Sequence, residues 1–286
     1  MVYLSQFCFP DREREYTFTM GQKRTCYDSV YPFLVVSEHN LRMLDLEPAT
    51  ILYGGNGSGK TTVLNVIAEK LGLARDTLYN RSCFFEDYTQ MCSYKANGRI
   101  PAGSRIITSD DVFDFMLDIR SLNNGIDRKR EELLEDYLDT KYSDFQMRSL
   151  DDYGKLKKKI AVRKSTQSQY VRENLMDNVR EHSNGESAFL YFTDQIRENG
   201  LYLLDEPENS LSPEKQQELL KFLEDSARFF GCQFLIATHS PFLLSMRGAK
   251  IYDMDEETVD VKRWTELANV RAYFDFFMKY RREFGE

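Results

Sequence analysis

The sequence predicts an α/β fold whose core is a mixed, mainly parallel sheet. The clearest sign is a short apolar strand at 50–53 that leads into a glycine-rich loop and then into an amphipathic helix at 61–71. Two later apolar runs, at 201–204 and 233–238, are typical of parallel strands that helices cover on both faces. Residues 1–53 are expected to be mostly strands, which would add an antiparallel part at the N-terminal end of the fold.

The other elements follow from shorter patterns. Strands are predicted at 2–9 and 16–20, with charged turn residues between them and a further apolar run at 31–36. A strand at 105–108 precedes Ser109, Asp110 and Asp111, which are typical of a helix start. Later in the chain, Ser212 and Pro213 suit the cap and first turn of a helix that runs to about residue 230 and that Gly231 ends.

The loop after the first apolar strand fits the pattern G-x-x-x-x-G-K-[ST], which wraps nucleotide phosphates. Glycines let consecutive N–H groups turn toward phosphate oxygens, and the following helix directs its positive end at the same charge. Lys60 is expected to reach the β- and γ-phosphates, and the Thr61 hydroxyl to bind Mg²⁺. The predicted ATP-binding residues are Gly54, Gly55, Asn56, Gly57, Ser58, Gly59, Lys60, Thr61 and Thr62.

Composition limits the other function classes. The 286 residues form one large or two small domains, and a net charge of −8 gives no global basic signature for nucleic acid. The five cysteines include no C-x-x-C pair, so we expect reduced thiols rather than zinc ligands or disulfides. No apolar run reaches the length of a membrane span, and no secretory signal is visible. We therefore expect a cytoplasmic protein.

Acidic residues and a histidine follow the two later strands. Asp205 and Glu206 end the run at 201–204, where a metal ligand and a general base are expected downstream of a phosphate loop. His239 directly follows the strand at 233–238 and is one of three histidines in the chain. It is a candidate site residue, although a packed core histidine is the alternative.

A charged segment separates the phosphate loop from these strands. Residues 126–180 contain no proline and only one glycine, so we predict a helical insertion at about 112–181. Its run from Lys155 to Arg172 contains no acidic residue. This basic charge fits a solvated helix face. It also fits a surface that contacts nucleic acid or an acidic partner. Just after the insertion, Ser183 and Glu186 form a capping-box pattern that predicts a helix start.

Five motifs now stand in order, and together they resemble the ATP-binding-cassette ATPase superfamily. GGNGSGKTT is similar to its Walker A motif, HSNGES to the signature, LYLLDEPE to Walker B, ENSLS to the D-loop and ATHSP to the switch-histidine motif. The signature departs from the LSGGQ of transporters. The chain thus resembles soluble heads of the DNA-repair and chromosome-structure type, and compact ATPases of bacterial anti-phage systems such as the retron and Septu types. YPFLVV and the tail around Trp264 are also similar to this clade.

The resemblance implies a P-loop NTPase head over residues 1–286, with the helical insertion between the Walker A and signature motifs. It implies an Mg-dependent ATPase in which Lys60, Glu206 and His239 act in catalysis and Thr61 and Asp205 hold Mg²⁺. It also implies a homodimer, because heads of this superfamily enclose ATP between two protomers. In that arrangement Ser183, Asn184, Gly185 and Glu186 serve the partner's ATP, and Asn209 and Ser210 belong to the D-loop.

The function expected from this resemblance is an ATP-driven switch for an effector protein, such as a nuclease, in anti-phage defence or nucleic-acid surveillance. A DNA-repair or chromosome-organising head is the alternative, but about 55 residues between Asp127 and Glu181 are too few for the long antiparallel coiled coil of those proteins. A transporter subunit is disfavoured by the signature and by the lack of a clear Q-loop, for which Gln90 is only a weak match.

Overall fold

The computed structural model describes residues 1–23, 29–143, 162, 164, 166–178 and 183–285. The chain forms two compact units, of which the first comprises Met1–Phe113 with Asn184–Glu286 and the second comprises Asp114–Ser183. Within the described residues, no helix is both long enough and apolar enough to cross a membrane.

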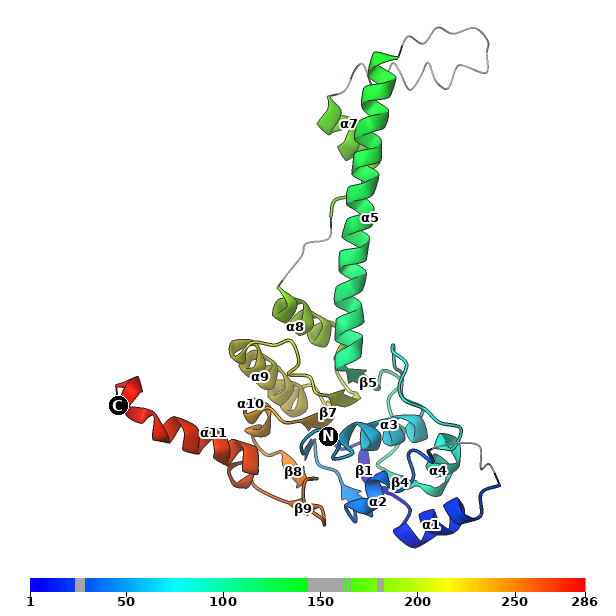
Figure 1. Ribbon diagram of the computed structural model, residues 1–286, viewed down its shortest axis with the longest axis vertical. Coiled ribbons are helices and arrows are strands. Elements are labelled where there is room, and N and C mark those ends of the chain that lie inside the picture. The colour runs from blue at the N-terminus through cyan, green and yellow to red at the C-terminus, as the bar shows by residue number, and fades with distance from the viewer. Residues whose placement is uncertain (24–28, 144–161, 163, 165, 179–182, 286) are drawn as a thin grey trace. The chain divides into compact units, whose positions relative to one another are not determined.

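The first unit is built on a six-stranded sheet (Figure 1). Its strands, in spatial order, are β5 (Arg105–Thr108), β6 (Leu201–Asp205), β7 (Gln233–Thr238), β3 (Ala49–Tyr53), β8 (Lys250–Asp253) and β9 (Asp260–Val261). The first five are parallel, and β9 is antiparallel to β8. Every residue of β3, β6 and β7 is buried, as the continuous apolar runs predicted. The predicted α/β fold is therefore confirmed.

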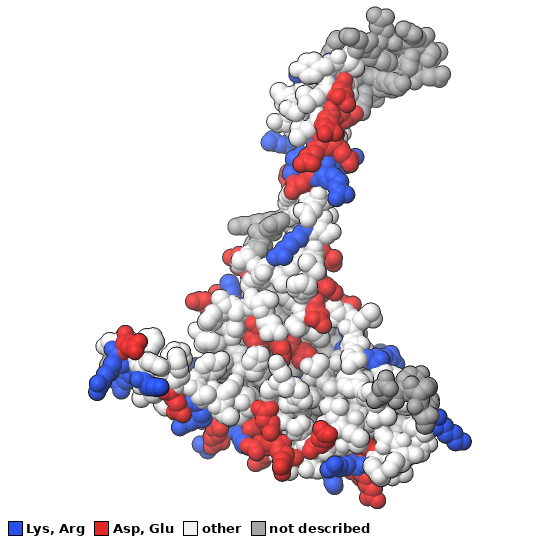
Figure 2. Space-filling view, viewed as in Figure 1, with Lys and Arg blue, Asp and Glu red and all other residues white. Residues whose placement is uncertain are grey.

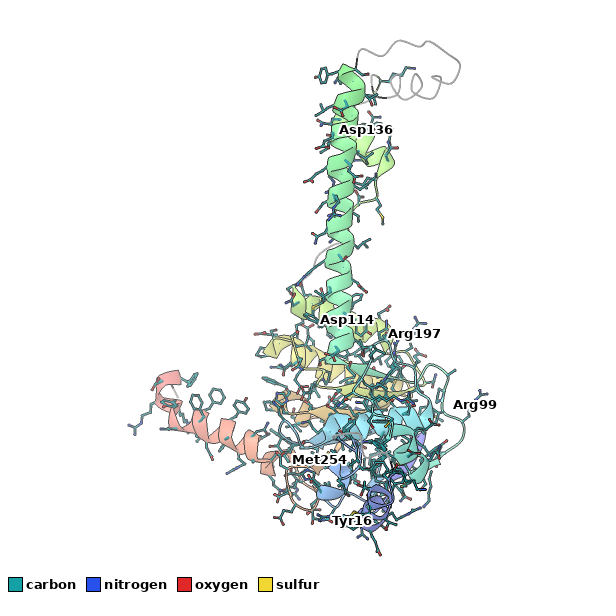
Figure 3. All side chains as sticks on the ribbon, turned by 45° about the vertical axis from the view of Figure 1, so that its right-hand side comes forward. Tyr16, Arg99, Asp114, Asp136, Arg197 and Met254 are labelled. Carbon is teal, nitrogen blue, oxygen red and sulfur yellow. The ribbon has the colours of Figure 1, made fainter. Side chains whose placement is uncertain are left out.

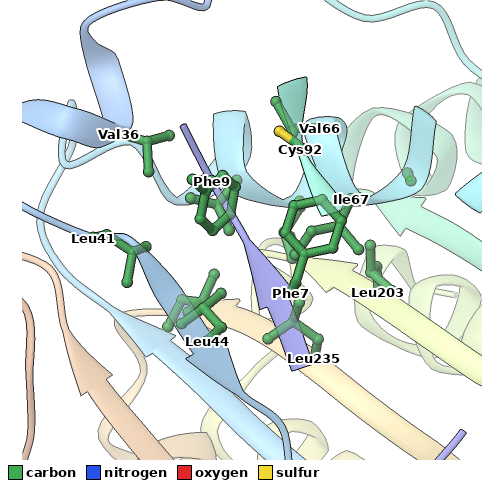
Figure 4. Close-up of a cluster of buried hydrophobic side chains, with 14 of the residues drawn as sticks. Phe7, Phe9, Val36, Leu41, Leu44, Val66, Ile67, Cys92, Leu203 and Leu235 are labelled. Atoms are coloured by element: carbon green, nitrogen blue, oxygen red, sulfur yellow. The ribbon is translucent and has the colours of Figure 1, made fainter. Parts of the chain in front are cut away.

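A second, antiparallel sheet consists of β2 (Met43–Asp45), β1 (Leu4–Cys8) and β4 (Ser93–Ala96), with β1 in the middle. Its apolar face shares one hydrophobic core with helix α3 (Lys60–Leu71) and the main sheet. Figure 4 shows Phe7 of β1 beside Ile67 of α3, with Leu203 and Leu235 of the main sheet close by. Each such fully buried side chain stabilises the fold by about 1.5–3 kcal/mol.

Helices complete the first unit. They are α1 (Arg12–Met20), α2 (Val35–Glu38), α4 (Phe85–Met91), α8 (Asn184–Gln195), α9 (Pro213–Phe229), α10 (Pro241–Leu244) and α11 (Ala268–Lys279), with the 3₁₀ turns η2 (Trp264–Glu266) and η3 (Arg281–Phe284). The predicted starts of α8 and α9 are confirmed, and the Ser212 side chain caps α9 by accepting from the Lys215 N–H. Helix α9 stops just before Gly231, whose φ of +67° lies in the left-handed region.

The strand predicted at 16–20 is wrong, because these residues form the end of α1. Asp11 caps this helix by accepting from the Arg14 N–H, and Gly21 ends it. The buried carboxylate of Glu15 then accepts hydrogen bonds from the Leu34 N–H, the Ser37 hydroxyl and the Tyr88 hydroxyl. The apolar run at 31–36 is likewise not a strand but a turn that leads into α2, which this carboxylate holds in place.

The second unit contains most of helix α5 (Ser109–Tyr142) and helix α7 (Gln167–Asn174). The predicted helix start at Ser109 is confirmed. A small core joins Tyr137 of α5 to Val162 and Tyr170, and the Tyr170 hydroxyl donates to Asp136 of α5. Half of the basic run from Lys155 to Arg172, including 155–161, lies outside the described residues.

Candidate functional site

The carboxyl ends of four neighbouring parallel strands meet at one edge of the main sheet. Tyr53 at the end of β3 is in register with Thr238 of β7 and with Asp253 of β8, and Asp205 of β6 is in register with Ala237. Ligands of open α/β sheets bind outside this edge. Met254, labelled in Figure 3, follows β8 and donates its N–H to Tyr53 O at 2.8 Å. The phosphate loop, the two acids and the histidine all follow these strand ends.

The loop from Gly54 to Gly59 is tightly folded. Gly57 and Gly59 have φ angles of +88° and +85°, which favour glycine, and a Cβ added to Gly54 would lie 2.5 Å from the Ser58 hydroxyl oxygen. Lys60 is 4% exposed, and its Nζ donates to Gly54 O at 2.6 Å and to Gly55 O at 2.9 Å. The ammonium group is thus held over the loop, and its contact with the β- and γ-phosphates stays a prediction.

Two features of the loop fit a bound phosphate group. The buried Ser58 hydroxyl has no hydrogen-bond partner among the described residues, which is uncommon for a buried polar group. The twelve-residue helix α3 begins at Lys60, so its N-terminal N–H groups and its dipole favour an anion at the loop. Thr62 lies in the first turn of the same helix, and its hydroxyl is 3.2 Å from the Tyr31 hydroxyl.

Thr61 and Asp205 form the predicted metal-ligand pair. The Thr61 hydroxyl donates to Asp205 Oδ1 at 3.1 Å. Burial raises the pKa of Asp205 to about 6; the Thr61 hydrogen bond and Lys60 oppose this rise, while Glu206 and Glu208 add to it. Across the described ranges, no group of three or more His, Cys, Asp or Glu side chains could hold a metal ion alone. Two oxygen ligands with phosphate oxygens and water would suit Mg²⁺.

Replacing Asp205 with asparagine should stabilise the nucleotide-free protein at neutral pH. Because the pKa of Asp205 is raised to about 6 in the fold from an unfolded value near 3.9, its protonated form stabilises the fold below about pH 4. This stabilisation, about 3 kcal/mol, is lost as the pH rises through 6. We expect Asp205→Asn to be more stable than wild type by up to this amount at pH 8, and the difference to shrink toward pH 4.

Urea unfolding at several pH values would measure this difference. The exposed Asp118, changed to asparagine, is the matched control and should leave the pH dependence unchanged. A difference between wild type and Asp205→Asn that does not vary with pH would show that the carboxylate is not destabilised by burial.

Glu206 and His239, the predicted base and phosphate sensor, lie close together. Glu206 has a φ of +47°, a conformation that costs a non-glycine residue about 1–3 kcal/mol and is found at functional sites. Its N–H donates to Ala237 O at 2.9 Å, and its Oε2 accepts from Asn209 Nδ2 at 3.2 Å. His239 Nδ1 lies 3.9 Å from Glu206 Oε1. The candidate base and the candidate phosphate sensor thus face one another at the sheet edge.

Glu208 is a site residue that the sequence reasoning missed. Its side chain is 5% exposed, and its Oε1 accepts from the Thr238 hydroxyl at 2.6 Å, the His239 N–H at 2.9 Å and the Ser240 N–H at 3.2 Å. His239 Nδ1 lies 3.3 Å from the same oxygen. The only signal in the sequence was the third acid of LYLLDEPE, two residues after Glu206. Glu208 positions the segment that carries His239.

Two residues near the C-terminus were also missed. Asn269, in the first turn of α11, donates from Nδ2 to His239 O at 2.7 Å, and its N–H donates to the Tyr53 hydroxyl at 3.2 Å. Asp255, after β8, accepts from the Gly55 N–H at 2.7 Å through Oδ1. These contacts tie the phosphate loop and the His239 segment to a part of the chain about 200 residues beyond the loop.

The signature residues lie at the start of α8. Ser183, Asn184 and Glu186 are exposed. A Cβ added to Gly185 would lie 3.3 Å from Ser210 O, so this glycine of the predicted signature packs closely on the backbone of the predicted D-loop. Ser210 itself has a φ of +68°. These residues are therefore accessible at the surface rather than buried in the core.

Several solved structures are similar to this chain at low sequence identity. An Smc head domain from Pyrococcus furiosus is 16% identical over 85% of this chain and 95% of its own, with a TM-score of 0.41. An SMC head domain from Thermotoga maritima is 11% identical over 77% and 92%, with a TM-score of 0.37. A dimeric ATP-binding cassette bound to ADP and Pi is 13% identical over 77% and 88%, with a TM-score of 0.34.

No curated protein matches the chain. Residues 68–245, more than half of the chain, match the family described as "AAA domain, putative AbiEii toxin, Type IV TA system". The chain therefore belongs to this family of AAA ATPase domains.

Proposed function

We propose that the protein binds ATP with Mg²⁺ and hydrolyses it. The observation that carries this proposal is the convergence of four groups at one sheet edge: the phosphate loop, the Thr61–Asp205 pair, Glu206 and His239. Phosphoryl transfer depends mainly on positioning and on the neutralisation of charge, and these groups provide both.

Each residue has a role in this proposal. Lys60 and the loop N–H groups hold the β- and γ-phosphates, and Thr62 contacts the α-phosphate. Thr61 and Asp205 hold Mg²⁺, which neutralises phosphate charge when bound. Glu206 orients the attacking water and accepts its proton, while His239 contacts the γ-phosphate and senses its presence. Glu208 and Asn269 fix the backbone of His239 from its N–H and carbonyl sides.

We further propose that ATP joins two heads. Ser183, Asn184, Gly185 and Glu186 would offer a hydroxyl, N–H groups and a helix N-terminus to ATP held by a second protomer, with the D-loops at Asn209 and Ser210 between them. The exposure of Ser183, Asn184 and Glu186 supports this role. Hydrolysis would release the heads, so the γ-phosphate would govern assembly.

The switch would act on an effector protein, a nuclease or similar enzyme, in the cytoplasm. The family description names a toxin of a type IV toxin–antitoxin system. We propose that the switch serves anti-phage defence or nucleic-acid surveillance. The 34 residues of α5 span about 50 Å, far less than the long coiled coils of chromosome-organising proteins, which makes that alternative weaker. Contact between the basic run from Lys155 to Arg172 and nucleic acid stays a prediction from the sequence.

Phosphate release from ATP by the wild-type chain tests the proposal directly. We expect turnover with Mg²⁺ and none with EDTA, because Thr61 and Asp205 act only through the cation. Light scattering should show a larger species with ATP than with ADP. Nucleotide binding without any phosphate release under Mg²⁺ would reduce the protein to a binding module and contradict the assignment of Glu206.

A further inference from the structure

An apolar groove of about 760 Å³ lies beside the segment that carries His239. One wall comes from His239 and Phe242, and the other from Trp264 and from Phe274 and Phe277 of α11. Both walls belong to the first unit. Apart from His239 and Glu208, the residues that line this groove have no role in the proposed ATPase reaction.

Helix α11 presents an unusually apolar surface to solvent. Tyr273, Phe274, Phe276, Phe277 and Met278 are each 47–56% exposed, and Val270 is the only described residue of the helix that is buried. Figure 1 shows α11 extending away from the sheet, and Figure 3 shows its side chains projecting clear of the rest of the unit. Contiguous exposed aromatic side chains mark an interaction surface rather than a free surface.

We propose that this groove docks an apolar, acidic helical segment of the effector protein. The inference rests on the proposed ATP switch and names the surface through which that switch reaches its partner. An amphipathic helix laid in an apolar groove is a common mode of peptide recognition, and it uses apolar anchors spaced three or four residues apart.

Charge complementarity selects an acidic segment. From Ala268 to Phe284 the chain carries four basic side chains, Arg271, Lys279, Arg281 and Arg282, against two acidic ones, Asp275 and Glu283, in a protein of net charge −8. Figure 2 shows Lys and Arg side chains at the free end of α11, with an acidic group beside them. Arg271 also lines the groove, with its guanidinium 5.4 Å from the Phe274 ring centroid. Acidic groups at the edge of the partner helix would meet these cations.

The same features disfavour two other occupants. A second copy of the chain placed by two-fold symmetry would bring two identical basic surfaces together, and like charges across an interface oppose association. A lipid surface would cover the exposed aromatic rings, but it would not fill a groove whose second wall is His239 and Phe242.

Asn269 connects this groove to the nucleotide site. This residue lies in the first turn of the helix that forms one wall, and it donates to the carbonyl oxygen of His239 at 2.7 Å. Glu208, which fixes the His239 N–H, lines the groove as well. A partner that shifts α11 would therefore shift the candidate γ-phosphate sensor, and by linkage the γ-phosphate would alter the affinity for the partner.

The test uses three synthetic helical peptides that share the same leucine positions and carry Glu, Gln or Lys at the flanking positions. Fluorescence anisotropy with the full chain, without nucleotide, measures the affinity for each peptide. The Glu peptide should bind most tightly and the Lys peptide most weakly, and the differences in affinity should become smaller as the salt concentration rises. The double change Phe274→Ser with Phe277→Ser should weaken the Glu peptide at least tenfold. Phe276→Ser, equally exposed but outside the groove lining, should change its affinity less than threefold.

Arg271→Glu is the second variant, and it should reduce or reverse the preference for the Glu peptide without altering the apolar walls. Thermal unfolding verifies that each variant is folded. If the Phe274→Ser, Phe277→Ser double variant is unfolded, the result for Arg271→Glu alone tests the proposal. The proposal is overturned if no peptide binds, or if the Lys peptide binds as tightly as the Glu peptide. It is overturned as well if the substitutions at Phe274, Phe277 and Arg271 leave the affinity for the Glu peptide unchanged. It is also overturned if anionic vesicles or self-association compete for the same aromatic residues.

Fluorescent-nucleotide titration on the same preparations separates the two proposals. Peptide binding with no nucleotide binding would overturn the ATP switch and leave the docking groove standing. Nucleotide binding and turnover with no peptide binding would overturn only the groove.

Discussion

Replacing Lys60 with alanine is expected to abolish nucleotide binding. The ammonium group is the main side-chain counter-ion for the phosphates, and each hydrogen bond to a charged group contributes about 1.5–3 kcal/mol. Losing two of them would weaken affinity by at least a hundredfold. Lys60 Nζ also donates to Gly54 O and Gly55 O, so its removal takes away a contact that fixes the loop.

Titration with a fluorescent ATP analogue measures this effect. Lys70→Ala is the matched control, because Lys70 lies on the same helix but donates to Thr89 O at 2.8 Å, outside the loop. The control should bind nucleotide as wild type does, even if it unfolds at a lower temperature. Unchanged affinity in Lys60→Ala would mean that the loop is not the nucleotide site.

The parts of the site that the sequence predicted are those set by local geometry. Strand, loop and helix follow one another directly around Lys60, and each has a pattern that depends only on near neighbours. Asp205, Glu206 and His239 each come at the end of a buried strand, and parallel strands bring such ends to the same edge. The approximate position of these residues therefore follows from pattern and chirality rules alone.

The errors and omissions have a different origin, because they depend on residues far apart in the chain. The segment at 31–36 is apolar enough for a strand, yet the Leu34 N–H and the Ser37 hydroxyl bind the buried carboxylate of Glu15. A local pattern cannot reveal a partner in another helix. Glu208 and Asn269 were missed for the same reason, since both act on His239 from 30 residues or more away.

Changing Glu206 to glutamine should leave nucleotide binding intact and nearly stop hydrolysis. The amide keeps the size of the side chain but cannot accept a proton from water, and loss of a general base costs about 10²–10⁴-fold in rate. Glutamine is a better test than alanine because residue 206 already has a strained φ of +47° and accepts from Asn209. With a smaller side chain, a change in the hydrolysis rate could come either from the loss of the base or from relaxation of the turn at residue 206.

Because the ATP bound to Glu206→Gln persists, the proposed ATP-joined dimer should persist with it. Light scattering of Glu206→Gln should then show twice the monomer mass with Mg-ATP and the monomer mass with ADP. The control is Glu218→Gln, which removes a surface charge paired with Lys215 and should hydrolyse ATP as fast as wild type does. Full turnover in Glu206→Gln would transfer the role of base to another group, and Glu208, 3.3 Å from His239 Nδ1, is the nearest candidate. If the variant binds ATP but stays monomeric at high concentration, two copies of this chain do not enclose the nucleotide. The head that pairs with Ser183 would then belong to a different polypeptide.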